Sequence, residues 1–212
     1  MSIYTEAQHI ADSGKRILVM VSRGRDSLCM VKVLRDTVPA DRLTFLHLRT
    51  YPNLEYINRH LDRIQAFFDI PLEIQPSRQL RKMQGGKLGD FSKERNEWRE
   101  HYGCDLVAYG FRSDESVSRS VIMRKCPNGI NEKSKECYPL KRFNRSIVAR
   151  MAERFRFPLA VEYEFGFRDV GEQFTGNTAV WLHDTFPDDF QRAAEVDPNI
   201  LSEYTRATGN PV

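Results

Sequence analysis

A polar turn rich in hydrogen-bond donors follows the first strongly apolar stretch of the chain, the run Ile17–Val21. The turn consists of Ser22, Arg23, Gly24, Arg25, Asp26 and Ser27. Serine hydroxyls and the free N–H groups that open a helix bind anions, and the helix dipole favours negative charge there. Gly24 allows a tight turn, and Arg25 offers a forked cation to phosphate oxygens. Asp26 either caps the helix or helps to hold a magnesium ion carried by a nucleotide.

A second turn of the same kind follows the apolar segment 105–109. It comprises Gly110, Phe111, Arg112, Ser113, Asp114, Glu115 and Ser116, with Arg119 three residues later. If a helix starts near Asp114, Glu115 and Arg119 share one face of it at i, i+4, so Glu115 is placed to orient an arginine that grips phosphate. Each turn alone also fits an ordinary capped helix start, so the interpretation depends on the two acting together.

Strands and helices alternate along the part of the chain that contains both turns. We expect strands at 16–22, 44–50, 71–75 and 105–111, helices at 3–12, from 27, at 54–68 and 92–102, and a loop at 77–90. Strands that are continuously apolar, rather than alternating, are typical of a parallel sheet covered on both faces. Ligands bind at the carboxyl ends of such strands, where both polar turns are expected to lie.

The two turns carry a resemblance to a known superfamily. VMVSRGRDSLCMVKVL resembles the PP-loop of the adenine nucleotide α-hydrolases, whose usual form is Ser-Gly-Gly-x-Asp-Ser. The second turn is similar to the Gly-x-Arg-x-x-Glu-Ser-x-x-Arg signature of phosphoadenosine-phosphosulfate reductases, matched by Gly110, Arg112, Glu115, Ser116 and Arg119. The resemblance implies an α/β, Rossmann-like, doubly wound and mostly parallel sheet. It also implies that the first loop binds the pyrophosphate of ATP or the equivalent group of a sulfonucleotide.

One residue of the first loop departs from this pattern, because Arg23 stands where the superfamily usually has glycine. Its side chain either intrudes on the phosphate site or points outward and adds charge. The resemblance continues more weakly through Tyr138–Phe143 and Tyr163–Phe167, to about residue 171. It implies that adenine lies against the backbone of Leu48 and Arg49.

These patterns divide the chain into a nucleotide-binding domain, 1–170, and a C-terminal appendage, 171–212, with one or two helices and irregular structure. Lys and Arg number 32 against 29 Asp and Glu, and this net charge of +3 does not indicate a nucleic-acid binder, although it does not exclude one. Nothing resembles a signal peptide or a membrane span, so a cytoplasmic protein is expected. A homo-oligomer is also expected.

The cysteines do not match those of a sulfonucleotide reductase. That family attacks sulfur with a cysteine in a C-terminal Glu-Cys-Gly-Leu-His segment, whereas no cysteine follows Cys137 here. No iron–sulfur cluster is expected, since the stretch after Phe167 lacks cysteine. Cys126 and Cys137 frame a polar loop whose spacing matches no common zinc pattern. Ordinary reduced thiols are favoured at both positions, as is a structural role for His47.

Three functional hypotheses remain open. The leading one is an ATP pyrophosphatase of adenylating type, a transferase in which Ser22, Arg23, Gly24, Arg25, Asp26 and Ser27 hold pyrophosphate with Mg²⁺ while Arg112 and Arg119 neutralise developing charge. The acceptor substrate is unknown. The second is a sulfonucleotide reductase in which Cys126 or Cys137 replaces the missing thiol. The third is a nucleotide-binding module without turnover. Small stand-alone relatives resemble proteins encoded by bacteriophages and mobile elements.

Overall fold

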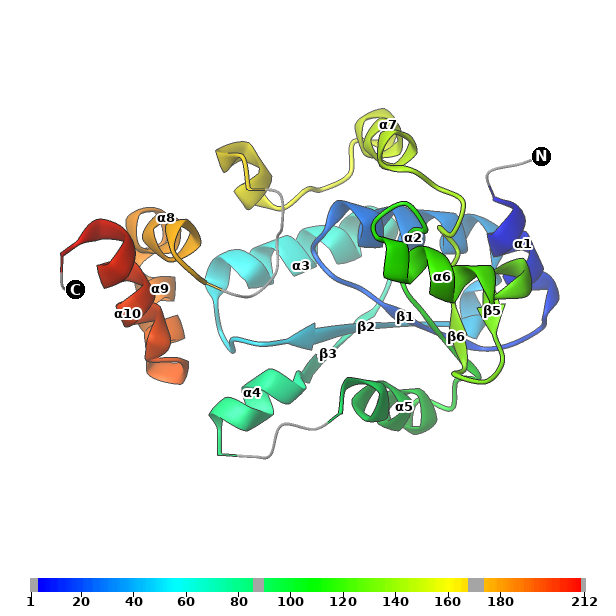
Figure 1. Ribbon diagram of the computed structural model, residues 1–212, viewed down its shortest axis with the longest axis horizontal. Helices are drawn as coiled ribbons and strands as arrows, with labels where there is room; N and C mark the ends of the chain where they lie inside the picture. The colour runs from blue at the N-terminus through cyan, green and yellow to red at the C-terminus, as the bar shows by residue number, and fades with distance from the viewer. Residues whose placement is uncertain (1–3, 86–89, 168–173, 211–212) are drawn as a thin grey trace.

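A single mixed sheet forms the centre of the protein in the computed structural model, which describes residues 4–85, 90–167 and 174–210 (Figure 1). Its strand order is β3-β2-β1-β4-β6-β5, and every neighbouring pair is parallel except β5 and β6. The strands are β1 Ile17–Met20, β2 Leu43–Arg49, β3 Leu72–Pro76, β4 Leu106–Ala108, β5 Ile130–Asn131 and β6 Glu136–Cys137. The predicted α/β class with a mostly parallel sheet is confirmed.

The chain reverses its direction of travel across the sheet between β1 and β4. From β1 it moves outward through β2 to β3, and then returns to place β4 on the other side of β1, with Val19 opposite Ala108. Connections that leave these two neighbouring strands diverge, so a crevice opens at their carboxyl ends. Both polar turns start there, Ser22–Ser27 after β1 and Gly110–Ser116 after β4.

Helices cover both faces of the sheet (Figure 1). The helices on one face are α1 Thr5–Asp12, α2 Arg25–Thr37, α3 Glu55–Phe68 and, packed outside α2, α7 Arg145–Phe155. The helices on the other face are α4 Arg78–Met83 and α5 Phe91–His101. Side chains of β1 alternate between the two cores: Ile17 and Val19 join the first, whereas Leu18 packs with Cys104 and Trp98 in the second. This division explains why the strand is apolar at every position.

Two segments differ from the sequence prediction. The predicted loop 77–90 contains α4, which begins where the Ser77 hydroxyl accepts a hydrogen bond from the Leu80 amide at 3.2 Å; Gly86 and Gly89, which suggested a loop, lie outside the described residues. The segment between Cys126 and Cys137 forms the hairpin β5–β6, which extends the sheet beyond β4. Two-residue strands in a polar segment give no periodic apolar pattern, so the sequence does not show them.

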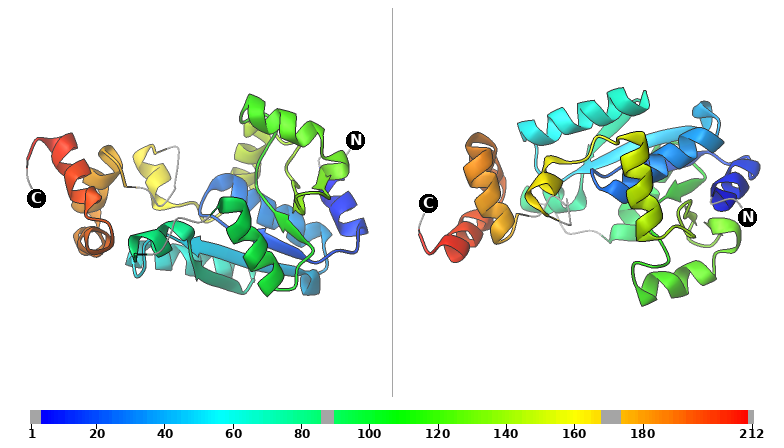
Figure 2. Two further views of the ribbon diagram at one scale, coloured as in Figure 1. Left: turned by 60° about the horizontal axis from the view of Figure 1, so that its bottom comes forward. Right: turned by 90° about the horizontal axis from the view of Figure 1, so that it is seen from above.

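Three helices, rather than one or two, form the C-terminal part, and they pack on one another at one end of the molecule in all views (Figures 1 and 2). They are α8 Asn177–Thr185, α9 Pro187–Val196 and α10 Asn199–Thr208. The buried carboxylate of Asp189 accepts hydrogen bonds from the amides of Glu55 and Tyr56 at 2.8 and 2.9 Å, and so caps α3. The predicted boundary at 170/171 lies outside the described residues, so the division into two domains stays a prediction. In the part of the chain with described coordinates, no helix combines the length and apolarity that a bilayer crossing needs.

Candidate functional site

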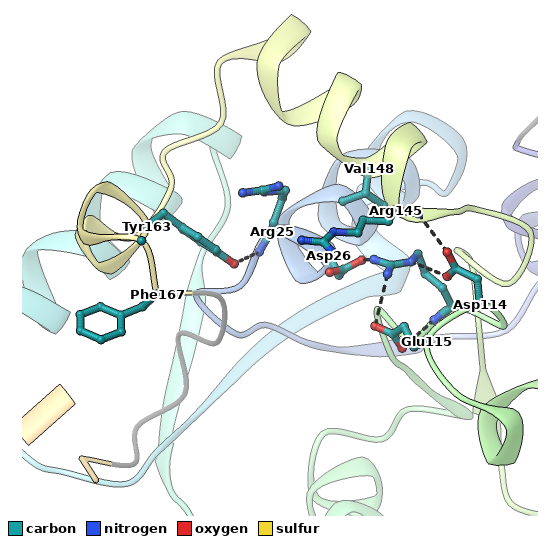
Figure 3. A pocket seen from close by; sticks show the side chains of 10 residues that line it. Arg25, Asp26, Asp114, Glu115, Arg145, Val148, Tyr163 and Phe167 are labelled. Atoms are coloured by element: carbon teal, nitrogen blue, oxygen red, sulfur yellow. Dashed lines mark hydrogen bonds and ion pairs between the residues drawn. The ribbon is translucent and has the colours of Figure 1, made fainter. Parts of the chain in front are cut away.

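A pocket of about 560 Å³ lies where the two polar turns meet (Figure 3). Its walls come from the start of α2, the turn after β4, the start of α7 and the 3₁₀ helix η3 Val161–Phe165. The lining residues are Arg25, Asp26, Arg112, Asp114, Glu115, Arg145, Val148, Tyr163, Gly166 and Phe167. Residues far apart in the sequence thus form one polar cavity at the carboxyl ends of β1 and β4.

Gly110 allows the close approach of the two turns. A Cβ atom at this position would lie 3.1 Å from the backbone carbon and oxygen of Asp26 and from the backbone nitrogen of Ser27. A side chain there would therefore push the turn after β4 away from the first turn of α2. Gly24, by contrast, has φ −76° and ψ 151°, values open to any residue, so the tight glycine turn expected there is not present.

The Arg112 side chain bridges the two turns and is held in one position by acidic partners. Its guanidinium forms an ion pair with Asp26, and its Nε donates to Asp114 Oδ1 at 2.9 Å. Its backbone N–H donates to Glu115 Oε2 at 3.1 Å. Only 7% of Arg112 is exposed, and its guanidinium faces the pocket with little freedom to move.

Asp114 connects the second turn to α7. While one carboxylate oxygen binds Arg112, the other accepts from the Arg145 amide at 3.0 Å (Figure 3). Burial opposes the charge of Asp114, but the hydrogen bonds from Arg112 and Arg145 outweigh it and hold the pKa of the carboxyl below its usual value. Asp114 therefore stays ionised and fixes the start of α7 beside the pocket.

The start of α2 is covered on one side by Tyr163. The Arg25 amide donates to the Tyr163 hydroxyl at 3.1 Å, and the Arg25 guanidinium lies over the same ring, 4.9 Å from its centre. The hydroxyl of Ser27 is used within the turn, since it accepts from the Ser22 amide at 2.7 Å. The amides of Asp26 and Ser27 precede the first intrahelical donor, Leu28, and so have no acceptor within the helix.

Arg23 takes neither of the two orientations considered from the sequence. It is 1% exposed and absent from the pocket lining, and its Nη2 donates to Glu162 Oε1 at 2.5 Å. Its guanidinium also lies 5.3 Å from the centre of the Tyr56 ring. The arginine in place of glycine is thus buried behind the loop and adds no charge to the pocket.

The structure brings together some of the predicted site residues and not others. Arg25, Asp26, Arg112 and Glu115 line the pocket, whereas Ser22, Gly24, Ser27 and Gly110 shape the turns behind it. Leu48 and Arg49 do not line it, and the Arg49 guanidinium donates to Asn58 at 2.7 Å.

The second turn also differs from prediction in where its helix begins. Helix α6 spans Val117–Arg124 rather than starting near Asp114, and the Ser116 hydroxyl caps it by accepting from the Arg119 amide at 3.2 Å. Arg119 pairs with Glu115 as predicted, but it lies over the Phe111 ring, 4.1 Å from its centre, and outside the pocket lining.

Six lining residues were not among the predicted site residues. Asp114, Tyr163, Gly166 and Phe167 belong to motifs noted in the sequence but received no site role, and Arg145 and Val148 lie outside those motifs. Arg145 is the first residue of the helix that follows the Tyr138–Phe143 segment. An arginine in the first turn of a helix was the sequence signal that could have indicated a site residue.

Charge in the pocket is balanced, since Arg25, Arg112 and Arg145 face Asp26, Asp114 and Glu115. All three carboxylates pair with arginines, and of these Asp26, with 36% of its side chain exposed, lies in the first turn of α2, where a cation carried by phosphates would meet it. No cluster of three or more acidic, histidine or cysteine side chains suited to a metal occurs within the described ranges. This donor set fits a magnesium ion that arrives on phosphates and takes one protein carboxylate.

The thiols and His47 are placed away from this chemistry. All four cysteines are buried. Burial raises the pKa of the Cys29 thiol to about 12 and also raises the pKa of Cys104, Cys126 and Cys137. His47 is buried, and its Nδ1 lies 2.9 Å from the Val21 carbonyl, in accord with the structural role predicted for it.

No family profile matches the sequence, and no curated protein matches it. Solved structures of PP-loop proteins do share its fold. The phosphoadenylyl-sulfate reductase of Candida auris, in a phosphate complex, has a TM-score of 0.56 and 14% identity over 81% of this chain and 88% of its own. The U34-tRNA thiolase NcsA of Methanococcus maripaludis, with its [4Fe-4S] cluster, has a TM-score of 0.52 and 14% identity over 93% and 77%.

The NH₃-dependent NAD synthetase of Campylobacter jejuni, in complex with nitrate, has a TM-score of 0.50 and 11% identity over 100% and 98% of the two chains. Identities this low establish a common fold and leave the reaction of this protein open. The PP-loop type of fold that the two motifs implied is therefore confirmed.

Proposed function

We propose that this protein binds ATP in the pocket between the two polar turns and that an acceptor attacks the α-phosphate, releasing pyrophosphate. The observation that carries the proposal is the contact of the two turns, in which Gly110 touches the backbone of Asp26 and Arg112 pairs with the same residue. Two anion-binding motifs at one sheet edge then serve one polyphosphate. The three similar structures are enzymes, which agrees with a catalytic role.

The pocket residues divide the work of such a transfer. Arg25 and the amide of Asp26 hold the β- and γ-phosphates at the start of α2. Arg112 and Arg145 also line the pocket and neutralise charge around the α-phosphate. The Asp26–Arg112 ion pair keeps Arg112 oriented until phosphate oxygens take over one of its donors. Magnesium carried by the nucleotide supplies further charge neutralisation and meets the Asp26 carboxylate.

In the reaction, a lone pair of the acceptor forms a bond to the α-phosphorus while the bond from that phosphorus to the bridging oxygen breaks. Pyrophosphate leaves with the electron pair, and the acceptor keeps the AMP group. Asp26, Asp114 and Glu115 each engage an arginine, so none of them is free to take a proton from the acceptor. The acceptor therefore attacks without a protein base, and any proton that it loses passes to solvent.

Calorimetry with Mg-ATP tests the binding step, and product analysis tests the chemistry. Arg112→Met should weaken ATP binding by roughly tenfold or more, the loss of one or two charge-assisted hydrogen bonds. Arg124→Met removes an exposed arginine on α6, outside the pocket lining, and should leave the affinity unchanged. Once an acceptor is supplied, pyrophosphate and the adenylated acceptor are expected, and free AMP appears only when a second nucleophile displaces it from the acceptor. Formation of ADP and phosphate alone would reject the mechanism.

A sulfonucleotide reductase is the main competing function, because the phosphoadenylyl-sulfate reductase shares the fold. That reaction needs an accessible thiolate, whereas Cys126 and Cys137 are fully buried and have raised pKa values. Sulfite release from a sulfonucleotide, lost in the Cys126→Ser/Cys137→Ser variant, would reverse this preference. A binding module without turnover has less support, since Arg23 leaves the pocket open.

A further inference from the structure

The charges of this protein are separated along the chain in a way that its small net charge conceals. Residues 111–156 contain twelve Lys and Arg against five Asp and Glu, a net charge of +7. Residues 157–212 contain three against ten, a net charge of −7. The acidic helices α8–α10 lie at one end of the molecule, whereas α6 and α7 lie away from that end (Figures 1 and 2). Such a polar molecule attracts an anionic polymer to one end only.

The exposed face of α7 concentrates this positive charge. Arg150 lies on the outer side of α7, Arg145 and Arg154 are exposed on its two flanks, and Arg156 ends the helix. None of these four makes an ion pair with any residue in the described parts of the chain. Glu153 is the one acidic residue on this face. We call these four side chains the arginine ridge.

The arginine ridge connects two cavities. At the first turn of α7, Arg145 and Val148 line the proposed nucleotide pocket. At the last turn, Phe155 lines a second hollow of about 270 Å³, with Phe67, Phe68, Lys32, Arg35 and Asp36. An eleven-residue helix spans roughly 15 Å, the length of about four or five stacked nucleotides in one strand.

The second hollow combines an exposed aromatic ring with cations. Phe67 is 43% exposed. The Lys32 ammonium lies 4.8 Å from the centre of the Phe155 ring, and Arg154 lies over the same ring. Exposed aromatic rings beside cations are the platforms on which single-stranded bases stack.

We infer that the arginine ridge binds the phosphodiester backbone of a single-stranded nucleic acid, and that this strand is the acceptor for the adenylating pocket. Binding along α7 follows from the ridge and the hollow, whereas the acceptor role rests on the proposed function. Arginine forks grip successive phosphates, Phe67 stacks on a base, and the strand leads to Arg145 at the mouth of the pocket. RNA and DNA share this chemistry and are separate arms of the test.

Fluorescence anisotropy with labelled 20-nucleotide RNA and DNA single strands tests the surface. The Arg150→Ala/Arg154→Ala variant should weaken binding at least about tenfold and lower the slope of log K against log salt by about 1.4, or about 0.7 per lost phosphate contact. Phe67→Ala should weaken binding about fivefold or more. The matched control, Arg59→Ala/Arg206→Ala, removes two arginines whose side chains are each 72% exposed but lie elsewhere, and should change neither quantity.

Three results would overturn the inference. One is the absence of RNA and DNA binding at low salt, and another is an equal loss in the control variant. The third is a preference of the ridge for an acidic protein segment. Either competition by poly-glutamate of equal charge or a ridge-dependent self-association that oligonucleotides do not disrupt would show it. Calorimetry with Mg-ATP on the same variants separates the two proposals. The Arg150→Ala/Arg154→Ala and Phe67→Ala variants should keep ATP binding. Failure of the wild type to bind ATP would reject the proposed function, and the anisotropy result would then decide the nucleic-acid surface by itself.

Discussion

Replacing Gly110 with alanine tests whether the two polar turns form one site. The new Cβ would lie 3.1 Å from three backbone atoms of Asp26 and Ser27, and backbone cannot move aside by rotating a side chain. Two further contacts fix the first turn of α2: the Ser22 amide donates a hydrogen bond to the Ser27 hydroxyl, and Arg112 forms an ion pair with Asp26. We expect an overpacking cost of about 1–3 kcal/mol. For a chain of this length, that cost lowers Tm by about 2–12 °C.

The same substitution should weaken Mg-ATP binding about tenfold or more, because separating the turns removes at least one charge-assisted hydrogen bond to phosphate. Gly14→Ala is the control: Gly14 has φ +71° and no atom within 4 Å of its virtual Cβ, so alanine there adds about 1–2 kcal/mol of backbone strain but no contact. Differential scanning calorimetry and ATP titration measure both effects. An unchanged Tm in Gly110→Ala would refute the packing argument, and a lowered Tm with unchanged ATP affinity would refute the shared site.

Three further predictions concern stability. Asp189→Ala removes the carboxylate that caps α3 and should cost about 1–2 kcal/mol in urea unfolding; a loss confined to α8–α10 in hydrogen exchange would contradict a role in α3. Glu162→Gln removes the charged partner of buried Arg23 and should lower the free energy of unfolding by about 3–5 kcal/mol. The Glu162→Met/Arg23→Met double variant should lower it clearly less, and equal losses would show that the ion pair is not the cause. Burial lowers the pKa of His60 to about 4, although the hydrogen bond to the Pro158 carbonyl acts in the opposite direction. The unfolded chain therefore binds an extra proton between pH 6.5 and 4. Stability is then full above pH 6.5 and falls by about 2 kcal/mol at pH 5, and a His60→Gln variant that keeps this pH dependence would exclude His60 as its source.

The architecture was predictable because its strands are buried on both faces. Ile17–Val21 is continuously apolar, and the β1 side chains at 17, 18 and 19 do enter two different cores. Periodicity also located α2, α3 and α5. The hairpin β5–β6 was not predictable in the same way, because its two-residue strands are too short for a periodic pattern and β6 is placed by its pairing with β4, Cys137 opposite Ala108.

The candidate site was predictable where it depends on chain turns and unpredictable where it depends on packing between distant elements. Asp26 and Arg112 could be placed together because both follow neighbouring parallel strands. Arg145 could not, since its position results from Asp114 holding the first turn of α7, a contact across 31 residues. Arg119 was assigned to the pocket from motif spacing, but the Phe111 ring holds its guanidinium elsewhere.

Arg23 occupies the loop position at which the PP-loop pattern has glycine, and the structure accommodates its side chain by burying it. A buried arginine needs a countercharge, and Glu162, only 5% exposed, provides it from η3. The Arg25 amide donates a hydrogen bond to the hydroxyl of the neighbouring Tyr163. Arg23 and Arg25 of the turn thus bind two successive residues of η3, Glu162 and Tyr163. Arg23 therefore supports the Ser22–Ser27 turn through Glu162 and does not enter the pocket. If this reasoning holds, Arg23→Gly alone should lower stability by leaving Glu162 buried and unpaired, and should not raise ATP affinity, whereas a gain in affinity on titration would mean that Arg23 competes with phosphate.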